Sequence, residues 1–240
     1  MTPMVRLRSA IACVALSVGI ACGGSDPAGI AATAGQLPDA ASFVIYENGR
    51  RVGTMETSVT KTADGWRIQG SMQAAGAVPV TIPNLDIHYD PQWFGRFLTL
   101  EMKAPDAVIV HVAVTGAVTR TDIVREKSAR FQSSSVSPNT ILLPDRAYGA
   151  YEAVAARLAG GDAGDLPIFV APVGETRAIV DQMTVEPIKT ASGMVQATHY
   201  VLTEIRSRPT RVELWTDRRR LLRLDVPRDR ISVRRADMLP

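Results

Sequence analysis

The sequence predicts a mainly β protein: one strongly curved antiparallel sheet, half-barrel or barrel-like, with a single covering helix near residues 146–159. Three observations support this fold class. Runs of strand-type residues follow one another from residue 42 to residue 234, separated by short polar turns, which is typical of sandwiches and barrels. Asn48-Gly49 joins the first two runs, and Asn-Gly is the strongest short hairpin signal because both residues take positive φ. Only one stretch repeats apolar residues at helical spacing.

The elements follow in chain order. Before the helix, the strand-like runs occupy residues 42–47, 51–61, 66–74, 78–82, 97–103, 107–115, 117–126 and 129–135. After the helix they occupy residues 166–170, 178–189, 194–204, 210–216, 221–226 and 230–234. Because strand boundaries are hard to read from a single sequence, we expect about 11–14 strands in all. No internal boundary divides residues 41–240, which we expect to form a single β-rich domain.

The run at 107–114 is apolar on both faces. One face carries Val108, Val110, Val112 and Val114, and the other carries Ala107, Ile109, His111 and Ala113. A strand that is wet on one side alternates apolar with polar residues. The pattern therefore predicts that both faces are covered, by a second layer, a helix, a partner or a ligand.

The predicted helix has one apolar stripe. Tyr148, Tyr151, Val154, Ala155 and Leu158 recur at helical spacing. We expect Asp145 to cap its first turn and Gly160-Gly161 to end it. An amphipathic helix in a β chain usually packs on a curved sheet, so Tyr148, Tyr151 and Leu158 are expected to face the four valines across a hydrophobic cavity.

The first 21 residues predict a signal peptide. Arg6 and Arg8 precede a run of about 12 mostly apolar residues that ends at Ala21. That run is too short to cross a bilayer, which takes about 20 residues. The chain contains two cysteines, Cys13 inside this leader and Cys22 directly after it. The mature chain would hold a single Cys, which excludes an internal disulfide.

Cys22 after Ile20 and Ala21 resembles the cleavage site of bacterial lipoproteins. The resemblance implies that the Cys22 thiol carries a diacyl group and that the new amino terminus is acylated too. Gly19 departs from the pattern, in which Leu is usual at that position, and an ordinary secreted protein is the alternative. We therefore expect an exported chain, lipid-anchored in the cell envelope and facing the periplasm. Gly23, where Asp would favour retention in the inner membrane, favours the outer membrane in a Gram-negative cell.

Residues 22–40 predict a flexible tether, since they are mainly Gly, Ala, Ser, Asp and Pro. A random coil of this length spans roughly 20–25 Å, which would hold the domain clear of the headgroups.

The charge of the chain is nearly balanced but uneven. Without the leader it carries 25 basic and 24 acidic residues, and residues 205–240 alone hold 11 Arg against 5 acids. These arginines form either the solvated face of antiparallel strands or a surface that meets an acidic partner or a membrane. Near-neutral charge and only 5% aromatic residues argue against nucleic-acid binding.

Two segments resemble a broad group of bacterial envelope proteins. FVIYENGRRVGTMETSVTKTADGWRIQG (43–70) is similar to the first hairpins of uncharacterised periplasmic β-rich domains, and VELWTDRRRLLRLDVP (212–227) to their penultimate hairpin. The carrier and receptor of the outer-membrane lipoprotein pathway share this type of sheet closed by a helix. The resemblance implies a hydrophobic concavity for an acyl chain or another apolar ligand, and it implies no catalytic residues.

Motifs of enzymatic chemistry are absent from the sequence. It has no HExxH, GxSxG, Walker A loop or GxGxxG after a strand. His88, His111 and His199 lack partners at metal-ligand spacing, so neither a metal nor a cofactor is predicted. The leading hypothesis is a lipid-anchored envelope protein, not an enzyme, that binds an apolar ligand. A partner-docking lipoprotein that uses the Arg-rich C-terminal region is the alternative, and an accessory domain of a hydrolase is a third.

Overall fold

The computed structural model describes residues 40–239 except residues 105, 163 and 192. Eight strands precede the helix: β1 (Ala40–Glu47), β2 (Arg50–Thr62), β3 (Gly65–Ala74), β4 (Val80–Tyr89), β5 (Gly95–Met102), β6 (Val108–Thr115), β7 (Val118–Arg125) and β8 (Ser128–Ser135). Seven more are β9 (Ile141–Leu142), β10 (Asp165–Val170), β11 (Gly174–Thr190), β12 (Gly193–Glu204), β13 (Thr210–Asp217), β14 (Arg220–Val226) and β15 (Ile231–Arg235). The helix α1 spans Tyr151–Ala159.

All of these strands belong to one sheet. Its order is β8-β7-β6-β5-β4-β3-β2-β1-β15-β14-β13-β12-β11-β10-β9. Consecutive strands pair in antiparallel fashion from β1 to β8 and from β10 to β15, while β1 pairs with β15 and so joins the two halves of the chain. The predicted fold class is therefore confirmed: the protein is mainly β, and its curved antiparallel sheet is curled without closing into a barrel.

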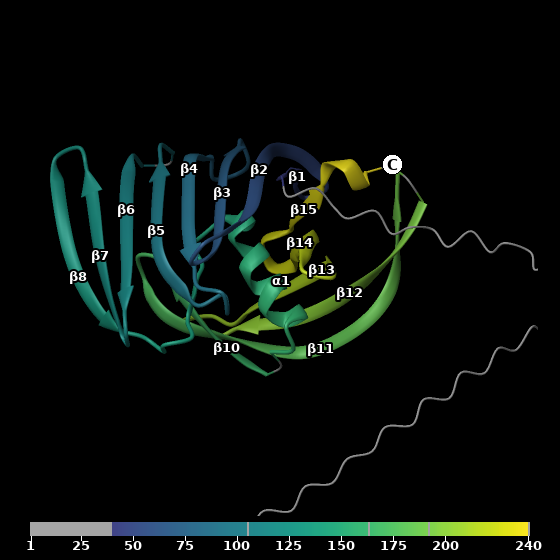
Figure 1. Cartoon of the computed structure of the whole chain (residues 1–240). Coiled ribbons are helices and arrows are strands. Elements are labelled where there is room, and N and C mark those ends of the chain that lie inside the picture. Colours follow the sequence, from purple (N-terminus) through teal and green to yellow (C-terminus); the bar gives the residue numbers. More distant parts are fainter. Residues whose placement is uncertain (1–39, 105, 163, 192, 240) are drawn as a thin grey trace, which may run out of the picture. The chain divides into compact units, whose positions relative to one another are not determined.

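The curl brings the two halves of the sheet face to face, with α1 between them (Figure 1). Two hydrogen bonds join the segment around β9 to β4 and β5, in the first half of the sheet. The backbone N–H of Gly95 donates to the carbonyl of Thr140 at 2.8 Å, and the Tyr89 hydroxyl donates to the carbonyl of Leu142 at 2.7 Å. The two-residue strand β9, which the sequence analysis did not predict, pairs in parallel with β10.

Helix α1 is buried almost all the way round. Every residue from Tyr151 to Leu158 is buried, and four of its nine residues are Ala. Ala has the highest helix propensity and the smallest side chain after Gly, so the helix can form in a confined space between two sheet layers. Glu152 and Arg157 are buried with partners: Glu152 accepts the backbone N–H of Leu221 at 2.9 Å, and Arg157 donates to the carbonyl of Asn139 at 2.9 Å.

The predicted boundaries of the helix need one correction. Gly160 ends it as expected, but Asp145 does not cap it. A 3-10 turn at Tyr148–Ala150 leads into α1, and the N-cap is Ala150, with no side-chain cap. Asp145 instead forms an ion pair of 2.8 Å with Arg206. The capping expectation failed because a tertiary charge partner, which has no signature near Asp145 in the sequence, took up the carboxylate.

The strand predicted at 78–82 starts two residues later and continues to Tyr89 as β4. Pro83 and Asn84, which follow the predicted strand, lie where the register between β3 and β4 shifts. A bulge of this kind tolerates Pro because the extra residues leave the ladder of hydrogen bonds.

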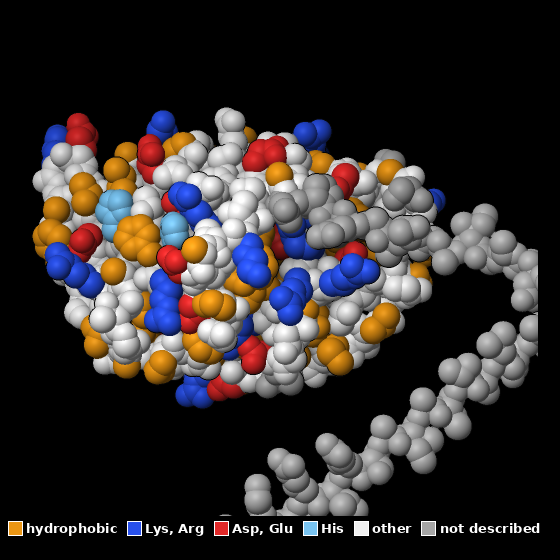
Figure 2. All heavy atoms as spheres, viewed as in Figure 1, with side chains coloured by type: hydrophobic (Ala, Val, Ile, Leu, Met, Phe, Trp, Pro, Cys, Tyr) orange, Lys and Arg blue, Asp and Glu red, His pale blue; other side chains and the backbone are white. Residues whose placement is uncertain are grey.

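Strand β6 is covered on one face only. Val108, Val110, Val112 and Val114 are buried in the main core, whereas Ile109 on the other face is 38% exposed. His111 and Ala113 on that face are half-buried. Among the described residues no second layer or helix covers this outer face, and its covering by a partner or a ligand stays a prediction. Hydrophobic and histidine side chains lie together on this outer surface over β4–β6 (Figure 2).

Candidate functional site

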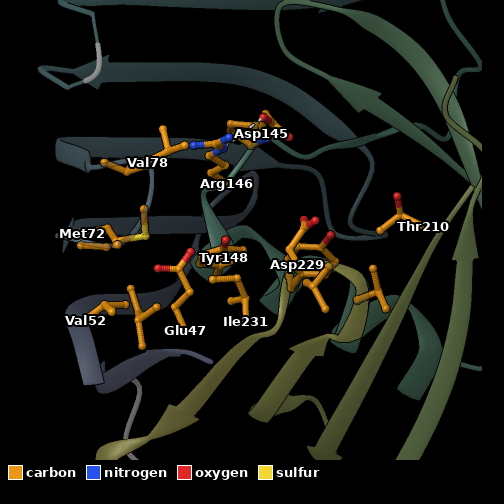
Figure 3. Close-up of a pocket in the computed structure, with 18 of the residues that line it drawn as sticks. Glu47, Val52, Met72, Val78, Asp145, Arg146, Tyr148, Thr210, Asp229 and Ile231 are labelled. Atoms are coloured by element: carbon orange, nitrogen blue, oxygen red, sulfur yellow. Dashed lines mark ion pairs between the residues drawn. The ribbon is translucent and has the colours of Figure 1, made fainter. Parts of the chain in front are cut away.

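The principal cavity has a volume of about 370 Å³. It lies on the concave side of the sheet, where strands from both halves approach the segment that leads into α1 (Figure 3). Its lining residues are Ile45, Glu47, Val52, Met72, Ala74, Gly76, Val78, Val80, Pro144, Asp145, Arg146, Tyr148, Tyr151, Glu204, Arg206, Thr210, Val212, Val226, Asp229 and Ile231. Sites for small molecules usually occupy about 300–1,000 Å³, so the volume is at the lower end of that range.

Polar and apolar groups share the surface of this cavity about equally. The apolar ones come from strands that turn alternate side chains inward. One wall comes from β1–β4 and their connection and includes Ile45, Met72 and Val80. The opposite wall comes from β13–β15 and includes Val212 and Ile231. The residues of these two walls are far apart in the sequence. The pairing of β1 with β15 brings the strands that carry them into one curved sheet.

A chain of polar groups runs along the inner end of the cavity. The Tyr151 hydroxyl donates to Oε1 of Glu204 at 2.5 Å. Oε2 of Glu204 pairs with Nε of Arg206 at 2.8 Å, and Nη1 of Arg206 continues to Asp145 at 2.8 Å. Glu204 is only 2% exposed, and these two partners offset the cost of burying its charge. Burial, followed by the neighbouring Glu204 carboxylate, raises the pKa of Tyr151, so the hydroxyl stays protonated and acts as a donor.

Four charged side chains surround Tyr148 in the cavity: Glu47, Asp229, Asp145 and Arg146 (Figure 3). Burial raises the pKa of Tyr148 to about 12, and Asp229, Asp145 and Glu47 act in the same direction, while Arg146 opposes them. The Tyr148 hydroxyl is therefore neutral at ordinary pH and can donate a hydrogen bond to a ligand.

The structure brings two of the predicted cavity residues into this site. Tyr148 and Tyr151 line the cavity. Val108, Val110, Val112 and Val114 on β6, and Leu158 on α1, are buried in the main core and are not among the lining residues. Cys22, the predicted site of lipidation, lies outside the described residues.

Sequence reasoning missed the charged members of the site. Glu47 and Asp229 lie at turns, where an acidic residue is unremarkable. Glu204 ends a predicted strand and Arg206 follows it. The pairing of Glu47 with Ile231, two positions after Asp229, brings the two carboxylates to the same cavity. Only the pairing of β1 with β15 could have indicated that these two carboxylates share a site.

The three histidines contact neighbouring side chains and do not line the cavity. Nδ1 of His111 lies 3.1 Å from the Thr99 hydroxyl, and His199 stacks on Trp215 with ring centroids 4.0 Å apart. His88 lies 3.4 Å from Asp86. Among the described residues, no group of three or more His, Cys, Asp or Glu is arranged to hold a metal ion.

The Arg-rich C-terminal region is partly neutralised by its own acids. Arg206, Arg211, Arg220, Arg223 and Arg235 each form an ion pair with a carboxylate. Two of those partners, Glu204 and Glu152, are buried. At least five of the 11 arginines in residues 205–240 are therefore paired with acids of the same domain, which reduces the positive charge available to an acidic partner.

Within the part of the chain that the structure describes, no helix is long and apolar enough to cross a bilayer. No protein-family model, curated protein or solved structure matches this chain. The resemblance to the outer-membrane lipoprotein carrier and receptor therefore stays a prediction.

Proposed function

We propose that this protein is a lipid-anchored envelope protein whose β domain binds a small ligand with an apolar body in the cavity around Tyr148. The observation that carries the proposal is the cavity itself. It combines about 370 Å³ of space with Val, Ile and Met side chains and with charged and hydroxyl groups that make up about half of its surface. In small-molecule sites apolar contact supplies affinity and polar groups fix orientation.

Binding without catalysis fits the lining residues better than hydrolysis does. Among the described residues that line the cavity there is no His, Ser, Cys or Lys. Thr210 and the two tyrosines supply hydroxyls, but no imidazole lines the cavity to activate them as nucleophiles. We therefore propose a binding or carrier role in preference to an enzymatic one.

A test uses the full chain with Cys22→Ser, so that the protein can be handled without detergent. Native mass spectrometry and organic extraction would identify any bound molecule, and fluorescence of Nile red, displaced by octanol, would report binding to the empty cavity. Val78 lies at the cavity and is 45% exposed. Val78→Trp should fill part of the space and weaken Nile red binding at least tenfold.

Val118 supplies the matched control. It is 47% exposed, on β7 and outside the cavity, so Val118→Trp should leave binding unchanged. A wild-type domain that carries no extractable ligand and does not bind Nile red would contradict the proposal, as would equal binding by the two Trp variants.

A further inference from the structure

The cavity is lined by more acidic than basic groups. Four are acidic, Glu47, Asp145, Glu204 and Asp229, and two are basic, Arg146 and Arg206. With all six ionised, the lining carries a net charge of two negative units. A cavity with walls of low dielectric constant strengthens the field of such charges relative to bulk water.

The excess negative charge is concentrated on two residues. Arg206 is already shared between Glu204 and Asp145. One carboxylate oxygen of Glu47 accepts the backbone N–H of Ala77 at 2.8 Å, an interaction that leaves its charge in place. Within the described part of the chain, neither Glu47 nor Asp229 forms an ion pair within 4.0 Å. Arg146 reaches Asp145 only at 3.9 Å, and both of those side chains are about half exposed.

The apolar walls and the two unbalanced carboxylates belong to the same space. Ile45 and Glu47 are on β1 and Ile231 is on β15, and all three line the cavity. Figure 3 shows Glu47, Tyr148 and Asp229 around the cavity, with Val52, Met72 and Val78 on one side of them. A ligand that lies on these aliphatic side chains would thus place its end group beside carboxylates.

We infer that the occupant is an amphipathic cation, an aliphatic chain with an ammonium head that lies between Glu47 and Asp229. This inference rests on the proposed binding function and names its ligand class. A fatty carboxylate would bring a third negative charge beside these two, with Arg146 as the only cation not already shared by two acids in the lining. An ammonium head restores charge balance, and Tyr148 can accept a hydrogen bond from it because a protonated hydroxyl keeps its lone pairs.

The test compares octylammonium, octanol and octanoate by isothermal titration calorimetry on the full chain with Cys22→Ser. The three probes share one chain and differ in head charge. We expect octylammonium to bind at least tenfold more tightly than octanol and octanoate to bind most weakly. The preference should shrink as sodium chloride is raised, since salt screens partly exposed charges.

Variants assign the preference to the two carboxylates. Glu47→Gln keeps an acceptor for the Ala77 N–H, and Asp229→Asn alters an exposed side chain, so both should remain folded. Each should weaken octylammonium binding about fivefold to tenfold and leave octanol binding unchanged. Arg146→Gln should strengthen octylammonium binding. Glu101→Gln, on β5 and outside the cavity, serves as the control and should change nothing.

The outcomes separate the two proposals. If octanol and octanoate bind as tightly as octylammonium, or if Glu47→Gln and Asp229→Asn leave its affinity unchanged, the cationic head is wrong while the cavity remains a binding site. If none of the three probes binds the wild-type protein, the binding function itself is wrong and the ligand class falls with it. The comparison of head groups on the wild type decides the matter even if a variant does not fold.

Discussion

The hydroxyl of Tyr151 donates a hydrogen bond of 2.5 Å to Oε1 of Glu204, and both residues are buried. The bond joins the first turn of α1 to the last residue of β12, 53 positions later in the chain. It thereby fixes α1 to β12, in the second half of the sheet, beside the cavity. The Glu204–Arg206–Asp145 ion pairs extend the same connection to the segment before the helix.

Tyr151→Phe should destabilise the protein by about 2 kcal/mol, because it removes the donor from a buried charged acceptor. The ring and its packing are kept, so the loss reports the hydrogen bond. The free energy of unfolding in urea would measure it. Tyr46→Phe is the control, since Tyr46 is half-buried and its ring contact with Arg234 does not need the hydroxyl. An unchanged free energy for Tyr151→Phe would show that Glu204 is satisfied by Arg206 alone.

Glu152→Leu should destabilise the protein by about 3 kcal/mol. Glu152 is 1% exposed, accepts the Leu221 N–H at 2.9 Å and lies 3.4 Å from Nε of Arg220. Leucine removes the acceptor of the buried Leu221 N–H and the oxygen that lies beside Nε of Arg220, and removing one partner of a buried polar contact is costly.

The matched variant Glu152→Gln should cost less than about 1 kcal/mol. Its amide oxygen can still accept the Leu221 N–H, and burial raises the pKa of Glu152, against the effect of Arg220. If Gln and Leu destabilise equally in urea unfolding, the carboxylate charge and not the hydrogen bond is what the site requires.

Gly95→Ala should destabilise the contact that holds the curl of the sheet. A Cβ at Gly95 would lie 2.5 Å from Cγ of Leu142, which is far inside the distance that real contacts allow. Overpacking of a close contact costs about 1–3 kcal/mol. The double variant Gly95→Ala with Leu142→Ala should be less destabilised than the sum of the single variants, and a double-mutant cycle measures the difference. Strict additivity would mean that the two residues do not press on each other.

The Arg67–Asp86 pair should make stability depend on acid pH. Two hydrogen bonds from Arg67, at 2.7 and 2.6 Å, lower the pKa of Asp86, and burial acts against them. The folded pKa thus lies below the unfolded value of about 4. The stabilisation is present above that unfolded value and is lost as the pH falls through the folded pKa.

Asp86→Asn should therefore be less stable than the wild type near neutral pH, and the difference should shrink as the pH falls below about 4. Urea unfolding of both proteins over this range gives the comparison. Asp122→Asn is the control because its partner Arg120 is largely exposed and exposed pairs contribute little. A difference between Asp86→Asn and the wild type that stays constant through acid pH would contradict the assignment.

Cys22→Ser should release the protein from membranes. Two or three acyl chains hold a protein firmly at about 0.8 kcal/mol per buried methylene group, and the substitution removes the site of acylation. The wild type should partition into the detergent phase of Triton X-114 and incorporate labelled palmitate, while the variant should do neither. Cys13→Ser changes a residue of the predicted leader and should behave as the wild type. A wild type found in the aqueous phase would contradict the lipid anchor.

Local pattern was sufficient for most of the elements. Alternation and turn chemistry located the hairpin at Asn48-Gly49, and helical spacing located α1. The errors have tertiary causes: Asp145 pairs with Arg206 instead of capping, and Pro83 sits at a bulge inside β4. Tyr148 and Tyr151 were found because their stripe faces the interior. Glu47 and Asp229 were not, since a single charged residue at a turn has no pattern.

The sequence by itself determined the local conformation of this protein, because periodicity, turn residues and propensity act between neighbours in the chain. Only the tertiary structure decided how the sheet curls and what its concave side encloses. The pairing of β1 with β15 joins residues 184 to 192 positions apart, Phe43 with Arg235 among them. That register places Glu47 beside the turn that holds Asp229. A cavity with apolar walls and unbalanced carboxylates is a property of this closure, and no stretch of the chain contains it alone.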